Sequence, residues 1–159
     1  MHLYIARHGV TVECRDWHGS DEARPLSEDG KEKIKAVFER LQHRKKIHID
    51  AIWASPLTRA LQTAHIAGAV LNSPVKVVQE LASGMSLKRL HLYLAKVQPT
   101  PERLMLVGHE PDCGIIIAEL IGDPTANYSL KKAGVASLVG NFEPGGMALV
   151  WRVAPKDIL

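Results

Sequence analysis

Two arginines and two histidines stand in short motifs whose side chains suit phosphate chemistry. Arg7 and His8 begin an Arg-His-Gly motif. Arg59 ends a Ser-Pro-Leu-Thr-Arg run, and His109 lies in a Gly-His-Glu-Pro motif. Guanidinium and imidazole groups can donate hydrogen bonds to phosphoryl oxygens, and several together strongly favour a dianion. If the fold brings the four side chains together, they predict a phosphate-binding site.

The elements expected around these motifs place each motif at the end of a strand. Strand-like segments at 2–6, 51–54 and 104–107 run directly into the three motifs. Helical patterns separate the strands, and this alternation is typical of a three-layer α/β sandwich with a mostly parallel central sheet. Ligands bind such sheets beyond the carboxyl ends of the strands. If the three strands are neighbours, the arginines and histidines converge on one point.

The remaining pattern completes this plan. Ser27 is a suitable N-cap for an amphipathic helix, and Ser55-Pro56 predicts the N-cap and first residue of a second helix. Gly122 predicts the end of a helix that begins at Pro111. The other expected elements are a strand at 75–78, a helix at 87–94, and an antiparallel hairpin of strands at 136–142 and 148–153.

Arg59 has an unusual position in this plan, because it lies in the first turn of a predicted helix. A positive charge there is disfavoured by roughly 0.3–1 kcal/mol unless an anion lies beside it. Taken alone, Arg59 could reach into solvent or pair with a surface acid. In the company of the other arginine and the two histidines, an anion-binding role is the better interpretation. The helix that begins at Pro111 can add free backbone N–H groups to the same place.

Two of the eight histidines stand out by their neighbours. His8 precedes Gly9 and His109 follows Gly108, and a glycine at a strand end lets the backbone approach a ligand closely. The other histidines follow no chemical pattern, so surface or packing roles suffice for them.

Other phosphate and metal chemistries lack their sequence signatures. No P-loop, GxGxxG or HExxH motif occurs, and neither Cys14 nor Cys113 is followed six residues later by the arginine of a cysteine-phosphatase loop. The side chains of His109, Glu110, Asp112 and Cys113 could ligate a metal, but nearby arginines would repel a dication. We therefore expect neither a metal ion nor another cofactor.

The composition is that of an ordinary globular protein. Hydrophobic residues make up 46% and charged residues 23% of the 159 residues, which argues against disorder and suits a single domain over 1–159. Two cysteines without a CxxC pair indicate reduced thiols and a cytoplasmic protein. No apolar run is long enough for a signal peptide or a membrane span. A net charge of +3 and 5% aromatic residues do not predict nucleic-acid binding, and the basic run at 44–46 suits a helix end.

Taken in order, the motifs resemble those of the histidine phosphatase superfamily, also called phosphoglycerate-mutase-like. The resemblance rests on residues 7–9, 55–64 and 107–110, and on Arg-Pro-Leu-Ser at 24–27. Larger members carry a capping insertion after the third strand, whereas here only residues 79–103 separate the third and fourth strands. The chain is therefore most similar to the short SixA-type phosphohistidine phosphatases, and the resemblance implies an open site with no cap insertion.

The resemblance also implies roles for the matched residues. His8 would attack phosphorus and become phosphohistidine, while its other ring nitrogen donates to a carbonyl. Arg7, Arg59 and His109 would bind the phosphoryl oxygens without a metal. In the same motifs, Gly9 and Glu110 are expected at the substrate.

Three further positions have two interpretations each. Thr11 stands where the family often has a small hydroxyl residue, and it could contact phosphate or only shape a turn. Glu80 is the candidate general acid, although a displaced imidazole needs much less help from an acid than an alkoxide does. Lys131 and Lys132 could line the entrance or could simply be solvated.

The implied activity is that of a phosphohistidine phosphatase. Its partner would be a phosphohistidine-bearing protein such as a histidine-phosphotransfer domain, because an open site suits phosphate carried by a protein. One alternative is a phosphatase for small phosphomonoesters with the same chemistry. Another is a non-enzymatic phosphate-binding module, which would need the arginines but not His8 as a nucleophile.

Overall fold

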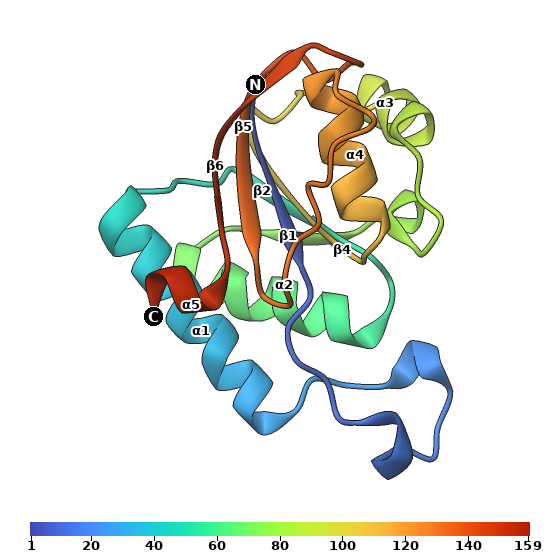
Figure 1. The fold of residues 1–159 in the computed structure, drawn as a ribbon, viewed down its shortest axis with the longest axis vertical. Helices are drawn as coiled ribbons and strands as arrows, with labels where there is room; N and C mark the ends of the chain where they lie inside the picture. Colours follow the sequence, from blue (N-terminus) through green and yellow to red (C-terminus); the bar gives the residue numbers. More distant parts are fainter.

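A six-stranded sheet forms the centre of the computed structural model, which describes residues 1–159 (Figure 1). The strand order is β3-β2-β4-β1-β5-β6. Strands β1 to β4 run parallel, β5 is antiparallel to β1, and β6 is antiparallel to β5. The strands are β1 His2–Arg7, β2 Ala51–Ala54, β3 Val75–Val77, β4 Arg103–Gly108, β5 Val135–Gly140 and β6 Met147–Val153. The mostly parallel sheet and the antiparallel hairpin are confirmed.

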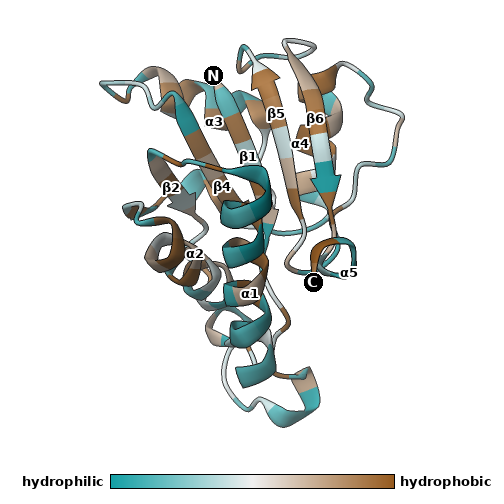
Figure 2. Ribbon diagram, turned by 90° about the vertical axis from the view of Figure 1, so that its left-hand side faces the viewer, coloured by the Kyte–Doolittle hydropathy of each residue, from teal (hydrophilic) through white to brown (hydrophobic).

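Helices cover both faces of this sheet, which confirms the three-layer sandwich. One face carries α1 (Glu28–Lys45), α2 (Thr58–Leu71) and the short α5 (Pro155–Ile158). The other carries α3 (Leu87–Ala95) and α4 (Asp112–Ile121). Figure 2 shows α1 and α2 in front of the sheet, with α1 mostly hydrophilic and β4 and β5 mostly hydrophobic. Alternate residues of the central strands point into the two cores, as the pleat requires.

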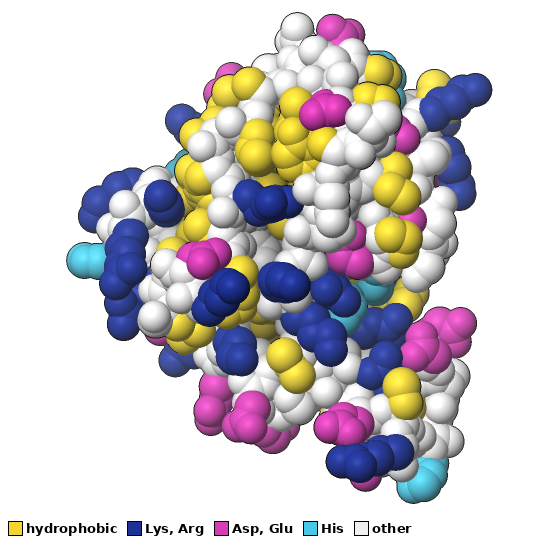
Figure 3. Space-filling model, viewed as in Figure 1, with side chains coloured by type: hydrophobic (Ala, Val, Ile, Leu, Met, Phe, Trp, Pro, Cys, Tyr) yellow, Lys and Arg dark blue, Asp and Glu magenta, His cyan; other side chains and the backbone are white.

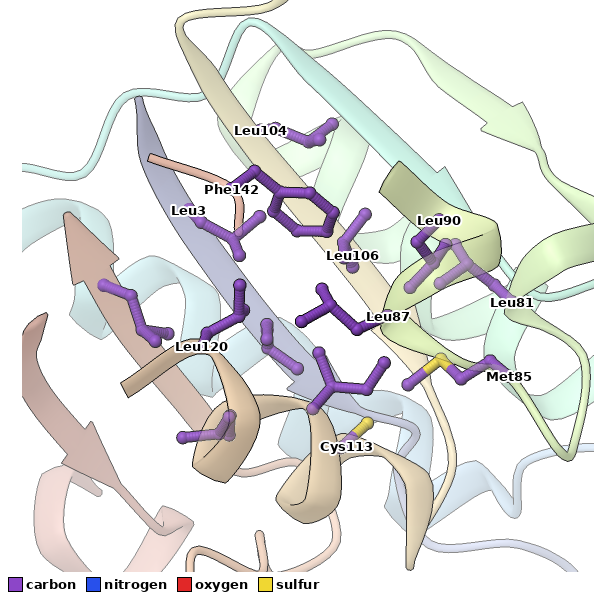
Figure 4. Packing of buried hydrophobic residues seen from close by; sticks show 14 of the residues in the cluster. Leu3, Leu81, Met85, Leu87, Leu90, Leu104, Leu106, Cys113, Leu120 and Phe142 are labelled. Atoms are coloured by element: carbon purple, nitrogen blue, oxygen red, sulfur yellow. The ribbon is translucent and has the colours of Figure 1, made fainter. Parts of the chain in front are cut away.

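The core between the sheet and α3 and α4 holds β4 and β1 in place (Figure 4). It is built mainly from fully buried aliphatic side chains, each stabilising the fold by about 1.5–3 kcal/mol. Examples are Leu3, Leu104, Leu106, Leu90 and Leu120. Cys113 of α4 is buried among them, and burial raises the pKa of its thiol. It therefore stays protonated and acts as a small apolar side chain.

The helix starts agree with the sequence in one case and differ in another. Ser27 caps α1, because its Oγ accepts a hydrogen bond from the N–H of Gly30 at 3.0 Å. The prediction that Ser55 caps α2 is wrong. The helix begins at Thr58, its N-cap is Leu57, and no side chain caps it. The hydroxyl of Ser55 instead forms a hydrogen bond with the ring of His109.

No inserted domain covers the carboxyl end of the sheet. Between β3 and β4 the chain forms only a 3₁₀ turn, Gln79–Leu81, and helix α3. Between β1 and α1 it forms two short 3₁₀ turns, Cys14–Asp16 and Asp21–Ala23, in a segment that projects beyond the sheet (Figure 1). None of the helices combines the length and the apolar character that crossing a membrane requires.

Candidate active site

The four predicted side chains come together at the carboxyl ends of three adjacent strands, β2, β4 and β1. Arg7 is the last residue of β1 and His8 follows it, while His109 follows β4 directly. Arg59 lies in the first turn of α2, after β2. The ring centroids of His8 and His109 are 5.4 Å apart, and Arg7, His8 and Arg59 line one cleft. The arrangement therefore depends on strand order, as expected for this fold class.

His8 is held as a neutral imidazole with a defined tautomer. Its Nδ1 lies 2.8 Å from the carbonyl oxygen of Gly9, and a carbonyl only accepts, so Nδ1 carries the proton. Burial lowers the pKa of His8 to about 4, helped by the positive charges of His109 when protonated, Arg59 and Arg7 and opposed by the Gly9 hydrogen bond. The lone pair is therefore on Nε2 at neutral pH. This state can attack an electrophile.

His109 is neutral for similar reasons. Burial lowers its pKa to about 4, helped by Arg59 and opposed by nearby Asp112 and Asp21. Its Nε2 lies 2.7 Å from the hydroxyl oxygen of Ser55, a residue with no exposed surface.

The hydroxyl of Ser55 defines the tautomer of His109. Its Oγ accepts a hydrogen bond from the N–H of Leu57 at 3.2 Å, and its own O–H has no acceptor other than His109 Nε2. Nε2 therefore accepts, and the proton of the neutral ring is on Nδ1. This contact was not predicted from the sequence, although the position of Ser55 directly after β2, at the same edge as His109, is a usable signal.

The two arginines are each anchored through part of the guanidinium group. Arg7 donates from one terminal nitrogen to the carbonyl of Leu130 at 3.0 Å. Arg59 donates to the backbone carbonyl of Asp21 at 2.8 Å and pairs with its carboxylate at 3.2 Å. The Arg59 side chain is buried, whereas that of Asp21 is 64% exposed. Arg59 thus has the acidic partner considered above, and it lowers the pKa of Asp21. Each guanidinium keeps further N–H groups for a ligand.

Three buried side-chain atoms have no hydrogen-bond partner, and all belong to residues singled out in the sequence. They are Nε of Arg7, Nδ1 of His109 and Oε2 of Glu80. Buried polar atoms are nearly always paired, so each unpaired atom calls for an explanation. The Arg7 and His109 atoms are N–H donors at the carboxyl ends of neighbouring strands. An anion with several oxygens would satisfy both.

Gly9 and Thr11 have structural contacts of their own. A side chain at Gly9 would lie 2.7 Å from Ile34 of α1, and the Gly9 N–H donates to Thr63 at 3.1 Å. The absence of a side chain at Gly9 therefore lets the backbone pack closely against α1. Thr11 lines the cleft, but its hydroxyl accepts a hydrogen bond from Arg24, and its backbone forms a bridge with Leu26. These contacts tie Thr11 to the segment before α1, and its contact with substrate stays a prediction.

Glu110 lies behind the site. Its carboxylate accepts hydrogen bonds from the N–H groups of Gly114 at 3.1 Å and of Leu130 at 3.0 Å, and it does not line the cleft. Because the carbonyl of Leu130 holds Arg7, Glu110 supports that arginine through the backbone. Its predicted contact with substrate stays a prediction.

Glu80 lies in the 3₁₀ turn after β3 and is half-buried. The loop that follows it is fastened to the start of α4, where the carboxylate of Asp112 accepts the Gly84 N–H at 2.7 Å. Glu80 does not line the cleft that contains His8. Its role as a general acid stays a prediction.

Comparison with known proteins decides the family. Residues 3–83, just over half of the chain, match the model of the histidine phosphatase superfamily (branch 1). The chain belongs to the histidine phosphatase superfamily. It is 38% identical over 141 residues to an uncharacterized protein of a Picosynechococcus strain, covering 87% of this chain and 84% of that one. It is 28% identical over 161 residues to the phosphohistidine phosphatase SixA of Escherichia coli K12, covering 99% and 96%.

The fold of this histidine phosphatase is also that of SixA. A solved structure of the protein histidine phosphatase SixA complexed with tungstate superposes with a TM-score of 0.85, at 26% identity over the whole of both chains. The chain is therefore a phosphatase of the metal-independent kind. The structure itself contains no group of three or more His, Cys, Asp or Glu side chains that could hold a metal ion.

The projecting segment before α1 forms one wall of the cleft of this histidine phosphatase. Its contribution comes from Val12, Glu13, Cys14, Asp16 and Arg24. Lys132 lines the cleft as well, and both it and Lys131 are exposed. Apart from the Arg-Pro-Leu-Ser motif, no pattern in the sequence predicts that this segment lies at the site, because its path depends on contacts with α2.

Proposed function

We propose that this histidine phosphatase, as a single catalytic domain over residues 1–159, hydrolyses phosphohistidine on a protein through a covalent intermediate on His8. The observation that carries the chemistry is the state of His8. Its ring is neutral, its Nδ1 proton is held by Gly9, and it lines the cleft with Arg7 and Arg59. A neutral imidazole with a free Nε2 lone pair, held among fixed cations, suits in-line attack on phosphorus.

In the first step, Nε2 of His8 forms a bond to phosphorus while the bond from phosphorus to the substrate imidazole breaks. The leaving imidazole nitrogen takes up a proton from solvent as it departs, and the attacking water of the second step returns a proton to solvent. In the second step, water attacks the same phosphorus, the bond to His8 breaks, and inorganic phosphate leaves. Arg7, Arg59 and the Nδ1–H of His109 hold the phosphoryl oxygens in both steps, and this charge stabilisation supplies most of the rate.

Two features support a protein as the carrier of the phosphoryl group. No inserted domain covers the cleft, so little of this chain surrounds a small substrate, and a protein substrate brings its own positioning surface. The chain also resembles SixA, a phosphohistidine phosphatase, along nearly its full length.

The two free cysteines, one of them exposed, suit a reducing compartment such as the cytoplasm.

A second candidate is the hydrolysis of small phosphomonoesters, and one observation favours it. The buried Oε2 of Glu80 has no partner, so it is free to hold a proton for an alkoxide leaving group. An alkoxide requires such an acid, whereas an imidazole, whose conjugate acid has a pKa near 6.5, requires it much less.

The test is a rapid-quench experiment with a phosphohistidine peptide that carries radiolabelled phosphate. We expect label to appear transiently on His8 of the wild type and to be absent from His8→Ala, which keeps its fold by circular dichroism. Retention of more than about a tenth of wild-type turnover by His8→Ala would contradict the covalent mechanism. For the substrate class, kcat/KM for phosphohistidine is expected to exceed that for sugar phosphates by about 10²-fold, or about 2.7 kcal/mol. Equal or better turnover of the sugar phosphates would favour the second candidate.

A further inference from the structure

A second hollow lies beside the cleft and is lined by positive side chains. Its charged residues are Lys33 of α1, Lys131 and Lys132 of the loop before β5, Lys156 of α5, and Arg7. We call it the lysine hollow. All four lysines are exposed, and none forms an ion pair with a carboxylate. No acidic residue lines it.

The lysine hollow is continuous with the catalytic cleft, because Arg7 and Lys132 line both. It also continues away from the cleft, since Lys131 and Lys156 line the next hollow together with Arg152 of β6. Asp157 is the only acid in that hollow, and its carboxylate accepts the backbone N–H of Ala154. Figure 3 shows the Lys and Arg side chains gathered over the middle of this face, next to histidine.

The lysine hollow contains more positive charge than binding of the phosphoryl group requires. Arg7, Arg59 and His109 already offer donors to its oxygens, and the lysines extend from the cleft mouth across α1 and α5. Unpaired like charges side by side repel one another, so an opposite charge nearby is favourable. A band of one sign that leads to a site also steers an oppositely charged partner and raises its association rate by 10–10³-fold.

We propose that the lysine hollow docks an acidic face of the protein that carries the phosphohistidine. This inference rests on the proposed function and specifies the partner's chemistry. Carboxylates beside the phosphohistidine contact Lys33, Lys131 and Lys156 while the phosphoryl group enters the cleft. The contacts are exposed and screened by salt, so their effect is on encounter and KM rather than on the chemical step.

The test compares two variants with the same change of charge. The first is the triple variant Lys33→Glu, Lys131→Glu, Lys156→Glu, which leaves out Lys132 because that residue also lines the cleft. The matched control is Lys88→Glu, Arg89→Glu, Lys96→Glu, which changes exposed cations of α3 and the residue after it, across the sheet from α1 and α5.

Three substrates separate docking from chemistry. They are free phosphohistidine, a phosphohistidine peptide flanked by glutamates, and the same peptide with glutamines in their place. At low salt we expect kcat/KM of the first variant to fall about 10–10²-fold for the acidic peptide, through KM, and to stay unchanged for the other two substrates. The control variant is expected to stay within about twofold for all three, and high salt should remove the difference.

The inference is overturned if the first variant keeps its kcat/KM for the acidic peptide, or if its kcat/KM falls equally for all three substrates. It is also overturned if the control variant shows as large a fall in kcat/KM for the acidic peptide. A second measurement tests docking without catalysis: the Kd of the unphosphorylated acidic peptide, determined by fluorescence anisotropy. If the wild type hydrolyses none of the three substrates, the proposed function is wrong. A Kd that is the same for the wild type and the first variant would show that the docking inference is wrong, whatever the enzyme hydrolyses.

Discussion

Replacing Ser55 by alanine removes one hydroxyl from the most enclosed part of the site. That hydroxyl contacts Nε2 of His109 at 2.7 Å and the N–H of Leu57 at 3.2 Å. Without it, neither nitrogen of the His109 ring has a fixed partner. The Nδ1–H that we assign to a phosphoryl oxygen is then one tautomer among two.

The size of the effect follows from these contacts. A net hydrogen bond contributes about 0.5–1.5 kcal/mol, and a buried group left unpaired costs about 1–3 kcal/mol. Since His109 is 4% exposed and Leu57 is half-buried, we expect the free energy of unfolding to fall by about 2–3 kcal/mol. Loss of a whole positioned donor lowers turnover about 10²–10³-fold. Ser55→Ala keeps the ring but frees its tautomer, so we expect kcat to fall about 10–10²-fold.

The chain offers a matched control in Ser137→Ala. Ser137 is also fully buried, and its hydroxyl lies 2.7 Å from a histidine nitrogen, Nε2 of His2, at the opposite end of β1. Both variants should lose stability in urea unfolding, but only Ser55→Ala should lose kcat. Nitrogen NMR of the His109 ring should show a protonated Nδ1 in the wild type and a mixture of tautomers in Ser55→Ala. If Ser55→Ala keeps kcat within about twofold while losing as much stability as Ser137→Ala, the hydroxyl only fills space and the tautomer argument is wrong.

Three further outcomes follow from the site. Arg59→Gln should lower turnover about 10²–10³-fold. Its stability should change by less than about 1 kcal/mol in thermal unfolding, because losing the pair with Asp21 offsets relief at the helix start. His8 and His109 have pKa values of about 4 when folded and near 6.5 when unfolded, so the unfolded chain binds more protons between these values. Stability should therefore fall as pH drops from 6.5 towards 4, while kcat/KM stays level through 6.5; an acid limb centred at 6.5 would contradict the neutral assignment. Glu80→Gln should impair phosphomonoester hydrolysis far more than phosphohistidine hydrolysis, and equal losses would assign Glu80 a role in both.

Convergence of the site could be predicted from the sequence because it depends on a general rule. Parallel strands end at one edge, so motifs that follow adjacent strands meet there, as Arg7, His8 and His109 do. The family resemblance also implied a carbonyl partner for His8, and the structure identifies it as the carbonyl of Gly9.

The partners of Ser55 and Arg59 were not predicted, because the geometry of each contact depends on structure distant in the chain. Ser55 reaches His109 because β2 pairs with β4 in one register, with Ala54 opposite Val107. A shift of that register by one residue would turn its hydroxyl away, leaving the capping role that local sequence favours. Arg59 meets Asp21 only because the segment before α1 returns across α2. Neither contact leaves a periodic pattern in the sequence.

In the proposed reaction, in-line displacement at the uncovered cleft sets the order of events. In-line displacement sends the substrate imidazole away on the side opposite His8, and water must later approach phosphorus from that same side. A docked protein occupies this path, so it has to depart before the phosphoenzyme can be hydrolysed. With no lid to open, the departure of the dephosphorylated partner is a required step of each turnover. Contacts through exposed lysines suit this requirement, because they raise the association rate of the partner without lengthening its residence time.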